Sequence, residues 1–315
     1  MSHDPRWRAR FIGPASHHRL DDPAPALQRA FEVRPGLERA TLHVSALGVY
    51  DLTVNGQRSS DRVLAPGWTA YDHRLRFHSD DVTGLLREGR NTLRAVLGNG
   101  WYRGRLTWLG RRDLYGDRLA LIAQLELRYA DGSGETVVTD ESWEARTTGI
   151  LSDDLYDGET RDLTRTEGEP EPVSLVDYPL DRLVAPESAP VRVVQVVPAG
   201  EVLRSPSGRL LVDFGQNLVG WVRLRVHSPR GGRRIVVRHA EVLEDGELGV
   251  RPLRTAKATD TYLLDDADEV VLEPRFTVHG FRYAEVSGLD DLRAADIEAV
   301  VVSSDLERIG WFSCS

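Results

Sequence analysis

Cysteine is almost absent from this 315-residue sequence, in which Cys314 is the only one. A single thiol cannot form an internal disulfide, so a small secreted scaffold held together by disulfide bridges is excluded. No histidine stands near Cys314 in the sequence. We therefore predict a buried or free thiol rather than a nucleophile.

Lysine is equally rare, since Lys257 is the only one, and the arginines that supply the remaining positive charge are scattered along the chain. The formal net charge is −9 and the sequence pI is about 5.5. A negative surface without a basic run repels phosphate backbones, so we expect no nucleic-acid partner. An acidic balance is compatible with a neutral ligand such as a sugar, although it does not identify one.

Long hydrophobic runs are missing as well. No stretch approaches the roughly 18 apolar residues that a membrane span needs, and the N-terminal residues 1–14 contain no apolar signal-peptide core. We therefore expect a protein of the cytoplasm without a membrane partner. The sequence also contains no phosphate-cradling glycine loop, no serine nucleophile elbow and no CxxC pair, so nucleotide chemistry is rejected.

Short β-type runs separated by turns dominate what is present. Asn55-Gly56 and Asp131-Gly132-Ser133-Gly134 are hairpin signals, and turns recur about every ten residues. Only Asp80–Leu86, which opens on acidic residues, predicts a short helical turn. The predicted fold class is all-β, with two consecutive jelly-roll-like β-sandwich domains.

The predicted organisation has five parts. A Pro/Glu-rich segment in the middle cannot supply a central strand, because proline lacks the backbone donor, and it is predicted to be a linker or an extended edge segment. The parts are an N-terminal segment with a first strand (1–30), a first sandwich (31–165), the linker (166–190), a second sandwich (191–300) and a connector (301–315).

Long motifs in both predicted sandwiches resemble bacterial α-L-rhamnosidases, glycoside hydrolase family 78. The first set is similar to the family's N-terminal, carbohydrate-binding-type jelly roll, although Thr160 stands where the family usually has an aromatic residue. The second set is similar to its second, concanavalin-like β-sandwich. The motifs are YDLTVNG (50–56), LAPGWT (64–69), LGNGWYRG (97–104), YDGETRD (156–162), VDFGQNLVGW (212–221), RHAEVL (238–243), TAKATDTY (255–262) and FTVHGFRYAEV (276–286).

The resemblance implies that a helical (α/α)₆ barrel follows the second sandwich. Residues 304–314 are similar to the short lead-in to that barrel. In the family, the barrel carries the general acid and the general base. Full-length members are inverting enzymes, and inversion needs two carboxyl groups roughly 6.5–9.5 Å apart. No residue of this sequence corresponds to either group, so we predict no catalytic residue here and no activity for the chain alone.

Several polar and aromatic residues are candidates for ligand contact. Trp68, Trp101 and Tyr102 could stack on a sugar ring or could fill a sandwich core. Asn99 lies between two glycines in a tight loop, and Asn55 could bind a hydroxyl group.

Calcium-assisted rhamnose binding by some modules of the family makes calcium the one cofactor to consider. The candidate oxygen ligands are Asp51, Asn55 and Asn99, but no EF-hand spacing supports them.

Two further residues, His279 and Arg282, lie in the last motif and are predicted to dock the second sandwich on the barrel. His239 and Glu241 share a strand face in the manner of a metal pair, but an ordinary strand end is the preferred interpretation.

Three functional hypotheses remain open. The chain is the non-catalytic β-sandwich portion of an α-L-rhamnosidase that positions a rhamnose-containing glycan, a stand-alone carbohydrate-binding protein, or the product of a split gene.

Overall fold

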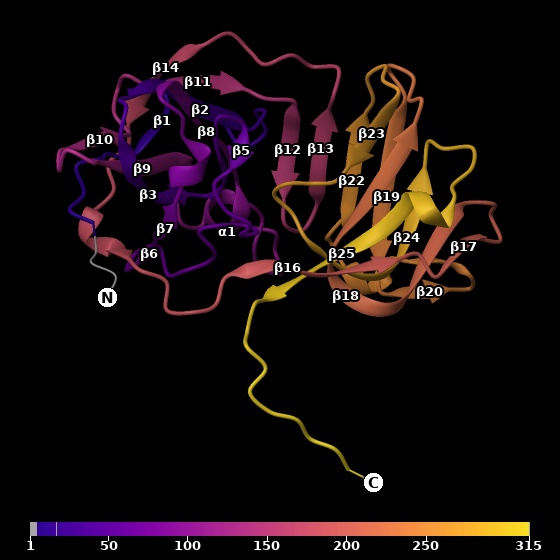
Figure 1. The fold of residues 1–315 in the computed structure, drawn as a ribbon. Coiled ribbons are helices and arrows are strands. Elements are labelled where there is room, and N and C mark those ends of the chain that lie inside the picture. Colours follow the sequence, from indigo (N-terminus) through magenta and orange to yellow (C-terminus); the bar gives the residue numbers. More distant parts are fainter. Residues whose placement is uncertain (1–4, 17, 315) are drawn as a thin grey trace.

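The computed structural model describes residues 5–16 and 18–314, and it consists of two β-sandwiches side by side (Figure 1). Strands dominate, and the one α-helix found among the described residues has four residues. The predicted all-β class is therefore confirmed. Within the described residues, no helix is long and apolar enough to cross a membrane.

The first sandwich is one eleven-stranded sheet folded into two layers. Strand β14 joins the layers, because its beginning pairs with β11 and its end pairs with β1. The strands in spatial order are β5 (Gln57–Arg58), β4 (Val49–Val54), β8 (Gly89–Gly98), β2 (Pro25–Val33), β11 (Glu144–Thr147), β14 (Glu171–Leu175), β1 (Ile12–Pro14), β9 (Ala120–Tyr129), β3 (Leu37–Leu47) and β7 (His78–Asp81), with β10 (Gly134–Val138) on β9.

Alternation of apolar residues along these strands builds the core between the layers. Leu42 of β3, Leu52 of β4 and Leu93 of β8 belong to one buried cluster. Both predicted hairpin turns are found, because Asn55 (φ 53°) and Gly56 (φ 81°) link β4 to β5, and the Asp131–Ser133 turn links β9 to β10. Positive φ at both central residues is the reason for the Asn-Gly pair.

The second sandwich is a ten-stranded sheet organised around a very long strand, β18 (Leu210–His227). The register of β18 against β24 shifts between Asp213 and Leu218, where Gly215 has φ +80°. This bulge bends the strand, and the residues before and after it have different second neighbours besides β24. The other strands are β12 (Ile150–Asp154), β13 (Gly158–Asp162), β22 (Thr259–Leu263), β19 (Arg234–Ala240), β24 (His279–Ser287), β25 (Ile297–Ser304), β16 (Val191–Pro198), β17 (Glu201–Arg204) and β23 (Glu269–Leu272).

The boundary between the sandwiches differs from the predicted one. Residues 150–162 were assigned to the first sandwich, but β13 pairs in parallel with β22 and extends the second sheet. The segment 166–190, predicted to be a linker or an edge segment, supplies an interior strand instead, because β14 pairs with β11 at its beginning and with β1 at its end. Pro172 lies at the β11 end, and β15 (Leu183–Val184) further along pairs with β6 (Leu75–Arg76). The N-terminal segment likewise supplies β1 and β2 to the first sandwich.

The remaining elements are short. The helical turn expected at 80–86 is smaller than predicted, because β7 continues to Asp81 and only Thr83–Leu85 turns. The short elements are η1 (Thr83–Leu85), α1 (Gly100–Arg103), η2 (Leu180–Arg182), η3 (Arg251–Leu253), η4 (Ala294–Asp296) and the hairpin of β20 (Val242–Glu244) and β21 (Glu247–Gly249).

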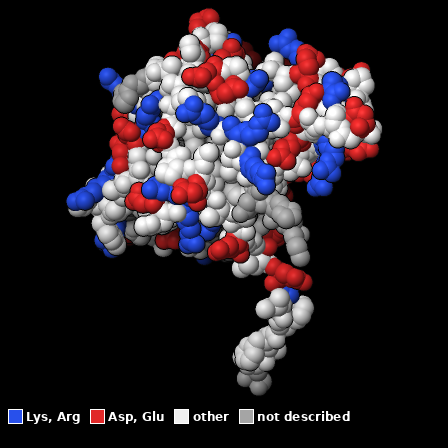
Figure 2. Space-filling view, turned by 90° about the vertical axis from the view of Figure 1, so that its left-hand side faces the viewer, with Lys and Arg blue, Asp and Glu red and all other residues white. Residues whose placement is uncertain are grey.

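An apolar cluster joins the two sandwiches. Ala26, Val49 and Val96 from the first pack with Ile150 and Phe276 from the second. Figure 2 shows one face of the molecule, where acidic and basic side chains are intermixed without a large patch of one sign. In Figure 1 the chain after β25 runs away from both sandwiches.

Candidate functional site: a groove with two stacked tryptophans

A groove of about 490 Å³ lies where the two sandwiches meet. Residues 62–68 and Trp101 line it from the first sandwich, together with Pro186 and residues 188–191. Val219, Val278 and the end of β25 line it from the second sandwich. Its lining is mainly apolar with a few polar groups, the usual character of a small-molecule site.

Backbone hydrogen bonds hold the groove loop in place. Val63 N–H donates to Val191 O over 2.9 Å, and Tyr50 N–H donates to Ala65 O over 2.8 Å. The first bond ties the loop to β16 of the second sandwich, and the second ties it to β4. The loop is therefore fixed to both domains.

Trp68 and Trp101 form a parallel aromatic pair in the lining of the groove. Their ring centroids are 6.3 Å apart and their planes differ by 4°. Trp68 is 51% exposed and its Nε1 donates to the hydroxyl of Tyr115 over 3.3 Å, whereas Trp101, on α1, packs partly against the core. A fixed, half-exposed indole face is the surface that the C–H face of a sugar ring would contact.

Arg62, Arg76 and His78 add polarity to the groove. Arg62 forms an ion pair with Asp80 over 2.7 Å, with both side chains largely buried. Burial raises the pKa of Asp80, although Arg62 acts in the opposite direction. Burial and the positive charge of Arg62 and Arg76 lower the pKa of His78 to about 4, so its imidazole is neutral at physiological pH. No local pattern in the sequence indicates these contacts, because Arg62 lies in a loop while Asp80 and His78 lie on β7.

The other predicted ligand residues have partners inside the protein. Tyr102 is only 7% exposed, and its ring packs against Tyr71 at 5.2 Å, so it presents no open face. Asn99 is buried: its N–H donates to Asp153 Oδ1 over 2.7 Å, and its Oδ1 accepts from Arg103 Nε over 2.6 Å. Sugar contact therefore stays a prediction for Trp68 and Trp101. Tyr102 and Asn99 are buried and belong to the interior.

The three predicted calcium ligands do not meet. The N–H of Asn55 donates to the carbonyl oxygen of Thr92, so Asn55 lies beside Thr92 of β8. Asn99 comes seven residues after Thr92, just beyond the end of β8, which places it roughly 23 Å from Asn55 at the rise of a β-strand. Asn55 Nδ2 donates to Asn91 Oδ1 over 2.8 Å, as a turn residue does. Asp51 is paired with Arg58 over 3.0 Å. One ion with ligands at 2.3–2.6 Å cannot join these groups.

The two predicted interface residues have different surroundings. Arg282 donates two hydrogen bonds to Asp213, over 2.9 and 2.8 Å, and its side chain remains partly exposed. His279 is 4% exposed, so it does not reach the surface at which another domain would dock. Docking through Arg282 stays a prediction, and His279 belongs to the interior.

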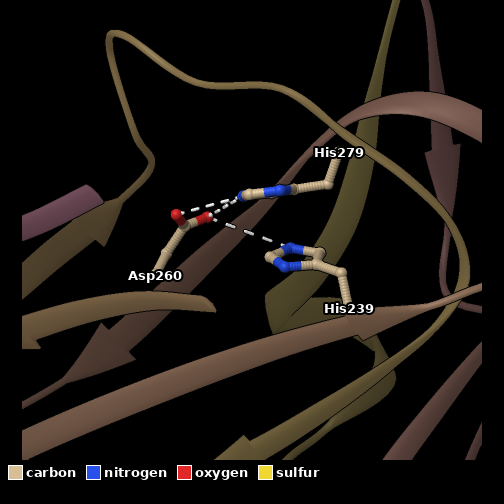
Figure 3. Close-up of side chains that lie close together, drawn as sticks. All are labelled: His239, Asp260 and His279. Carbon is tan, nitrogen blue, oxygen red and sulfur yellow. Dashed lines mark hydrogen bonds and ion pairs between the residues drawn. The ribbon is translucent and has the colours of Figure 1, made fainter. Parts of the chain in front are cut away.

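His279 lies in a buried cluster with His239 and Asp260 (Figure 3). The Nε2 atom of His279 is 3.2 Å from both Asp260 oxygens, and the two imidazole rings are stacked at 4.2 Å. The anticipated partner of His239, Glu241, is exposed and accepts a hydrogen bond from Asn217. Asp260 was not singled out by the sequence, although it lies in a recognised motif.

Family profiles cover both sandwiches of this chain. Residues 36–195 match the α-L-rhamnosidase N-terminal domain, and residues 203–303 match the bacterial α-L-rhamnosidase concanavalin-like domain. The chain belongs to the bacterial α-L-rhamnosidase family. The two matched domains meet at the groove.

Relatives in the family are much longer than this chain. An α-L-rhamnosidase of Streptomyces avermitilis is 43% identical over 80% of this chain, and one of Formosa agariphila is 29% identical over 98%. The chain spans 25% and 36% of their lengths.

Solved structures of α-L-rhamnosidases are similar in fold to this chain. The α-L-rhamnosidase of Aspergillus terreus has a TM-score of 0.92 at 38% identity, with 98% of this chain and 37% of that chain covered. The Streptomyces avermitilis α-L-rhamnosidase complexed with L-rhamnose has a TM-score of 0.85 at 38% identity, with 90% of this chain and 29% of that chain covered.

Proposed function

We propose that this chain is the non-catalytic β-sandwich portion of an α-L-rhamnosidase and that its groove positions a rhamnose-containing glycan. The catalytic partner is a helical barrel domain, which would hydrolyse terminal α-L-rhamnosides by inversion. The proposal includes a location in the cytoplasm, which cell fractionation would check. Two observations support the assignment to a β-sandwich portion of such an enzyme. The chain belongs to the family, and it covers only 25% of the length of the Streptomyces avermitilis relative.

The parallel pair Trp68 and Trp101 is the observation that carries the binding role. The indole of Trp68 is half exposed in a mainly apolar groove, and Arg76 and Ser303 line the same groove as hydrogen-bond donors. A deoxy sugar such as rhamnose has an apolar face and several hydroxyl groups. It would match an aromatic platform surrounded by donors.

A second cleft, of about 340 Å³, contains several carboxylates, and the contacts of two of them argue against their use in glycosidase chemistry. Asp154 accepts hydrogen bonds from the backbone N–H groups of Arg105, Tyr156 and Asp157. Asp157 is itself paired with Arg105 and with Lys257. An inverting pair needs one carboxyl free to protonate the leaving group and one free to activate water.

Titration calorimetry with L-rhamnose, with and without calcium, tests the binding role. We expect heat at millimolar ligand for the natural chain and a loss of at least tenfold in affinity for Trp68→Ala. Trp108→Ala is the matched control, because Trp108 is also exposed but lies outside the groove. Absence of heat from the natural chain, or an equal loss in both variants, would exclude the groove as a rhamnose site.

An aryl α-L-rhamnoside assay tests the non-catalytic assignment separately. The purified chain should release no aglycone above the buffer rate. Turnover that survives repeated purification would show that these residues carry a catalytic pair of their own.

A further inference from the structure

The buried cluster of His239, Asp260 and His279 brings three recognised motifs to one point. His239 lies near the end of β19, Asp260 lies in the neighbouring strand β22, and His279 is the first residue of β24. One ligand-type atom from each side chain lies within 4.8 Å of the other two. All three residues are at most 4% exposed.

The hydrogen bond of His239 fixes which nitrogen carries the proton. Nδ1 is 2.9 Å from the carbonyl oxygen of Ala258, which can only accept, so Nδ1 bears the hydrogen. In the neutral ring, Nε2 then has a free lone pair. Burial, together with the neighbouring His279, lowers the pKa of His239 to about 3, which keeps the ring neutral.

That lone pair has no hydrogen-bond partner. Nε2 of His239 is fully buried and unbonded, and the atom facing it is an oxygen of Asp260 at 3.9 Å. Two acceptors that face each other in a dry interior leave a buried polar group without a hydrogen bond, which is unfavourable. Figure 3 shows both rings and the carboxylate directed toward the same point.

Asp260 is held in position as an anion. Its Oδ1 accepts a hydrogen bond from the N–H of Glu159 over 2.9 Å, and both oxygens face His279. Burial acts against ionisation, but His279 and the hydrogen bonds keep the pKa of Asp260 below its ordinary value. The cluster therefore combines one carboxylate with two imidazole nitrogens, one of which is unpaired.

We propose that His239 Nε2, the Asp260 carboxylate and His279 Nε2 form a binding site for a divalent transition-metal ion, with zinc as the best match. Two imidazoles and a carboxylate are a zinc donor set, whereas calcium prefers oxygen ligands alone. The bond from His239 Nδ1 to Ala258 and the bond from Glu159 to Asp260 are the outer contacts that orient metal ligands.

The role of such an ion is structural, because the site is closed to solvent. Three separate strands supply the ligands, so the ion would join β19, β22 and β24 as the second sandwich folds. To bind the ion as a neutral ligand, the imidazole of His279 would carry its single proton on Nδ1, so that Nε2 presents a lone pair. This site is separate from the groove, so its failure would leave the proposed sugar-binding role untouched.

Metal analysis of the refolded chain tests the site directly. The protein is unfolded with a chelator, refolded with zinc and dialysed against metal-free buffer, and zinc is then counted by mass spectrometry. We expect a single zinc per chain and a Tm several degrees above that of the chelated protein. A clearly substoichiometric zinc content in the folded natural chain would overturn the proposal.

Variants locate the ion. His239→Gln and Asp260→Asn should each lose the zinc and the gain in Tm. His227→Gln is the matched control, because His227 is exposed and paired with Glu269 and Asp296 over 3.2 and 3.0 Å, away from the cluster. Retention of zinc by both cluster variants, or its loss only in the control, would contradict the assignment.

X-ray absorption on the zinc-loaded natural chain covers the case in which the variants do not fold. We expect scattering from two imidazole rings and a light-atom first shell. A first shell without imidazole would place the metal elsewhere and overturn the proposal.

Discussion

Gly98 touches the ring of Phe276 at the junction of the two sandwiches, and the contact leaves no space for a side chain on Gly98. A Cβ atom there would lie 2.5 Å from Cγ of Phe276. Phe276 is 1% exposed and belongs to the apolar cluster that joins the domains, so it cannot move aside without disturbing both. The glycine of the LGNGWYRG motif is therefore a packing residue.

Gly98→Ala should lower the free energy of unfolding by about 1–3 kcal/mol, because the new methyl group overpacks the junction. Chemical denaturation monitored by tryptophan fluorescence would measure the loss. Gly84→Ala serves as the control, since a Cβ at Gly84 meets nothing within 4 Å. Equal stability of the two variants would show that the junction can relax around an added methyl group.

Arg103 organises the loop around Asn99 in the same motif. It is 1% exposed, and it donates to Asn99 Oδ1 over 2.6 Å and to the carbonyl oxygens of His18 and Asp117 over 3.1 and 3.3 Å. Lysine keeps the charge but cannot reproduce the planar fork that reaches three acceptors.

Arg103→Lys should therefore cost roughly 2–4 kcal/mol of unfolding free energy, because buried acceptors lose their donors. Thermal and denaturant unfolding would measure the cost. Arg39→Lys is the control, because Arg39 is exposed and lies 3.7 Å from its partner Asp81. A cost below that of the control would mean that the loop does not depend on the guanidinium.

Local sequence predicted the strands and turns of this fold better than it predicted their pairing. The Asn55-Gly56 turn follows from positive φ at two adjacent residues, which is a local property. The strand pair 150–162 carries the same alternation as its neighbours, and nothing local indicates that it joins the second sheet. Sheet membership depends on which distant strand, here β22, offers a free edge.

The candidate site shows the same limit. Trp68 and Trp101 could be predicted because large aromatic residues in glycine-rich loops are uncommon and chemically suggestive. Their parallel contact depends on tertiary packing across 33 residues of sequence. Asp260 was missed for a similar reason. A single aspartate in a β-strand is no sign of a metal site until the fold brings two histidines from other strands beside it.

His78 makes the stability of the first sandwich depend on pH. Burial, with Arg62 and Arg76, lowers its pKa to about 4, whereas an unfolded histidine titrates near 6.5. The contribution of the neutral ring is therefore complete above about pH 6.5 and is lost as the pH falls toward 4. The difference corresponds to about 3 kcal/mol at most.

We expect His78→Gln to be less sensitive to acid than the natural chain. The free energy of unfolding, measured from pH 7 to pH 4.5, should fall less steeply in the variant because glutamine cannot take up a proton. A slope equal to that of the natural chain would show that His78 has the same pKa in the folded and the unfolded chain.

Substitution of tyrosine by phenylalanine should have opposite effects on stability at Tyr50 and at Tyr178. The hydroxyl of Tyr50 is buried without a hydrogen-bond partner, while that of Tyr178 donates to the carbonyl oxygen of Tyr71 over 2.6 Å. Removal of an unsatisfied buried hydroxyl is neutral or favourable, whereas removal of a bonded one loses roughly 0.5–1.5 kcal/mol. Tyr50→Phe should thus unfold at the same or a higher denaturant concentration than the natural chain, and Tyr178→Phe at a lower one. A destabilised Tyr50→Phe variant would mean that the hydroxyl of Tyr50 has a bonded partner in solution.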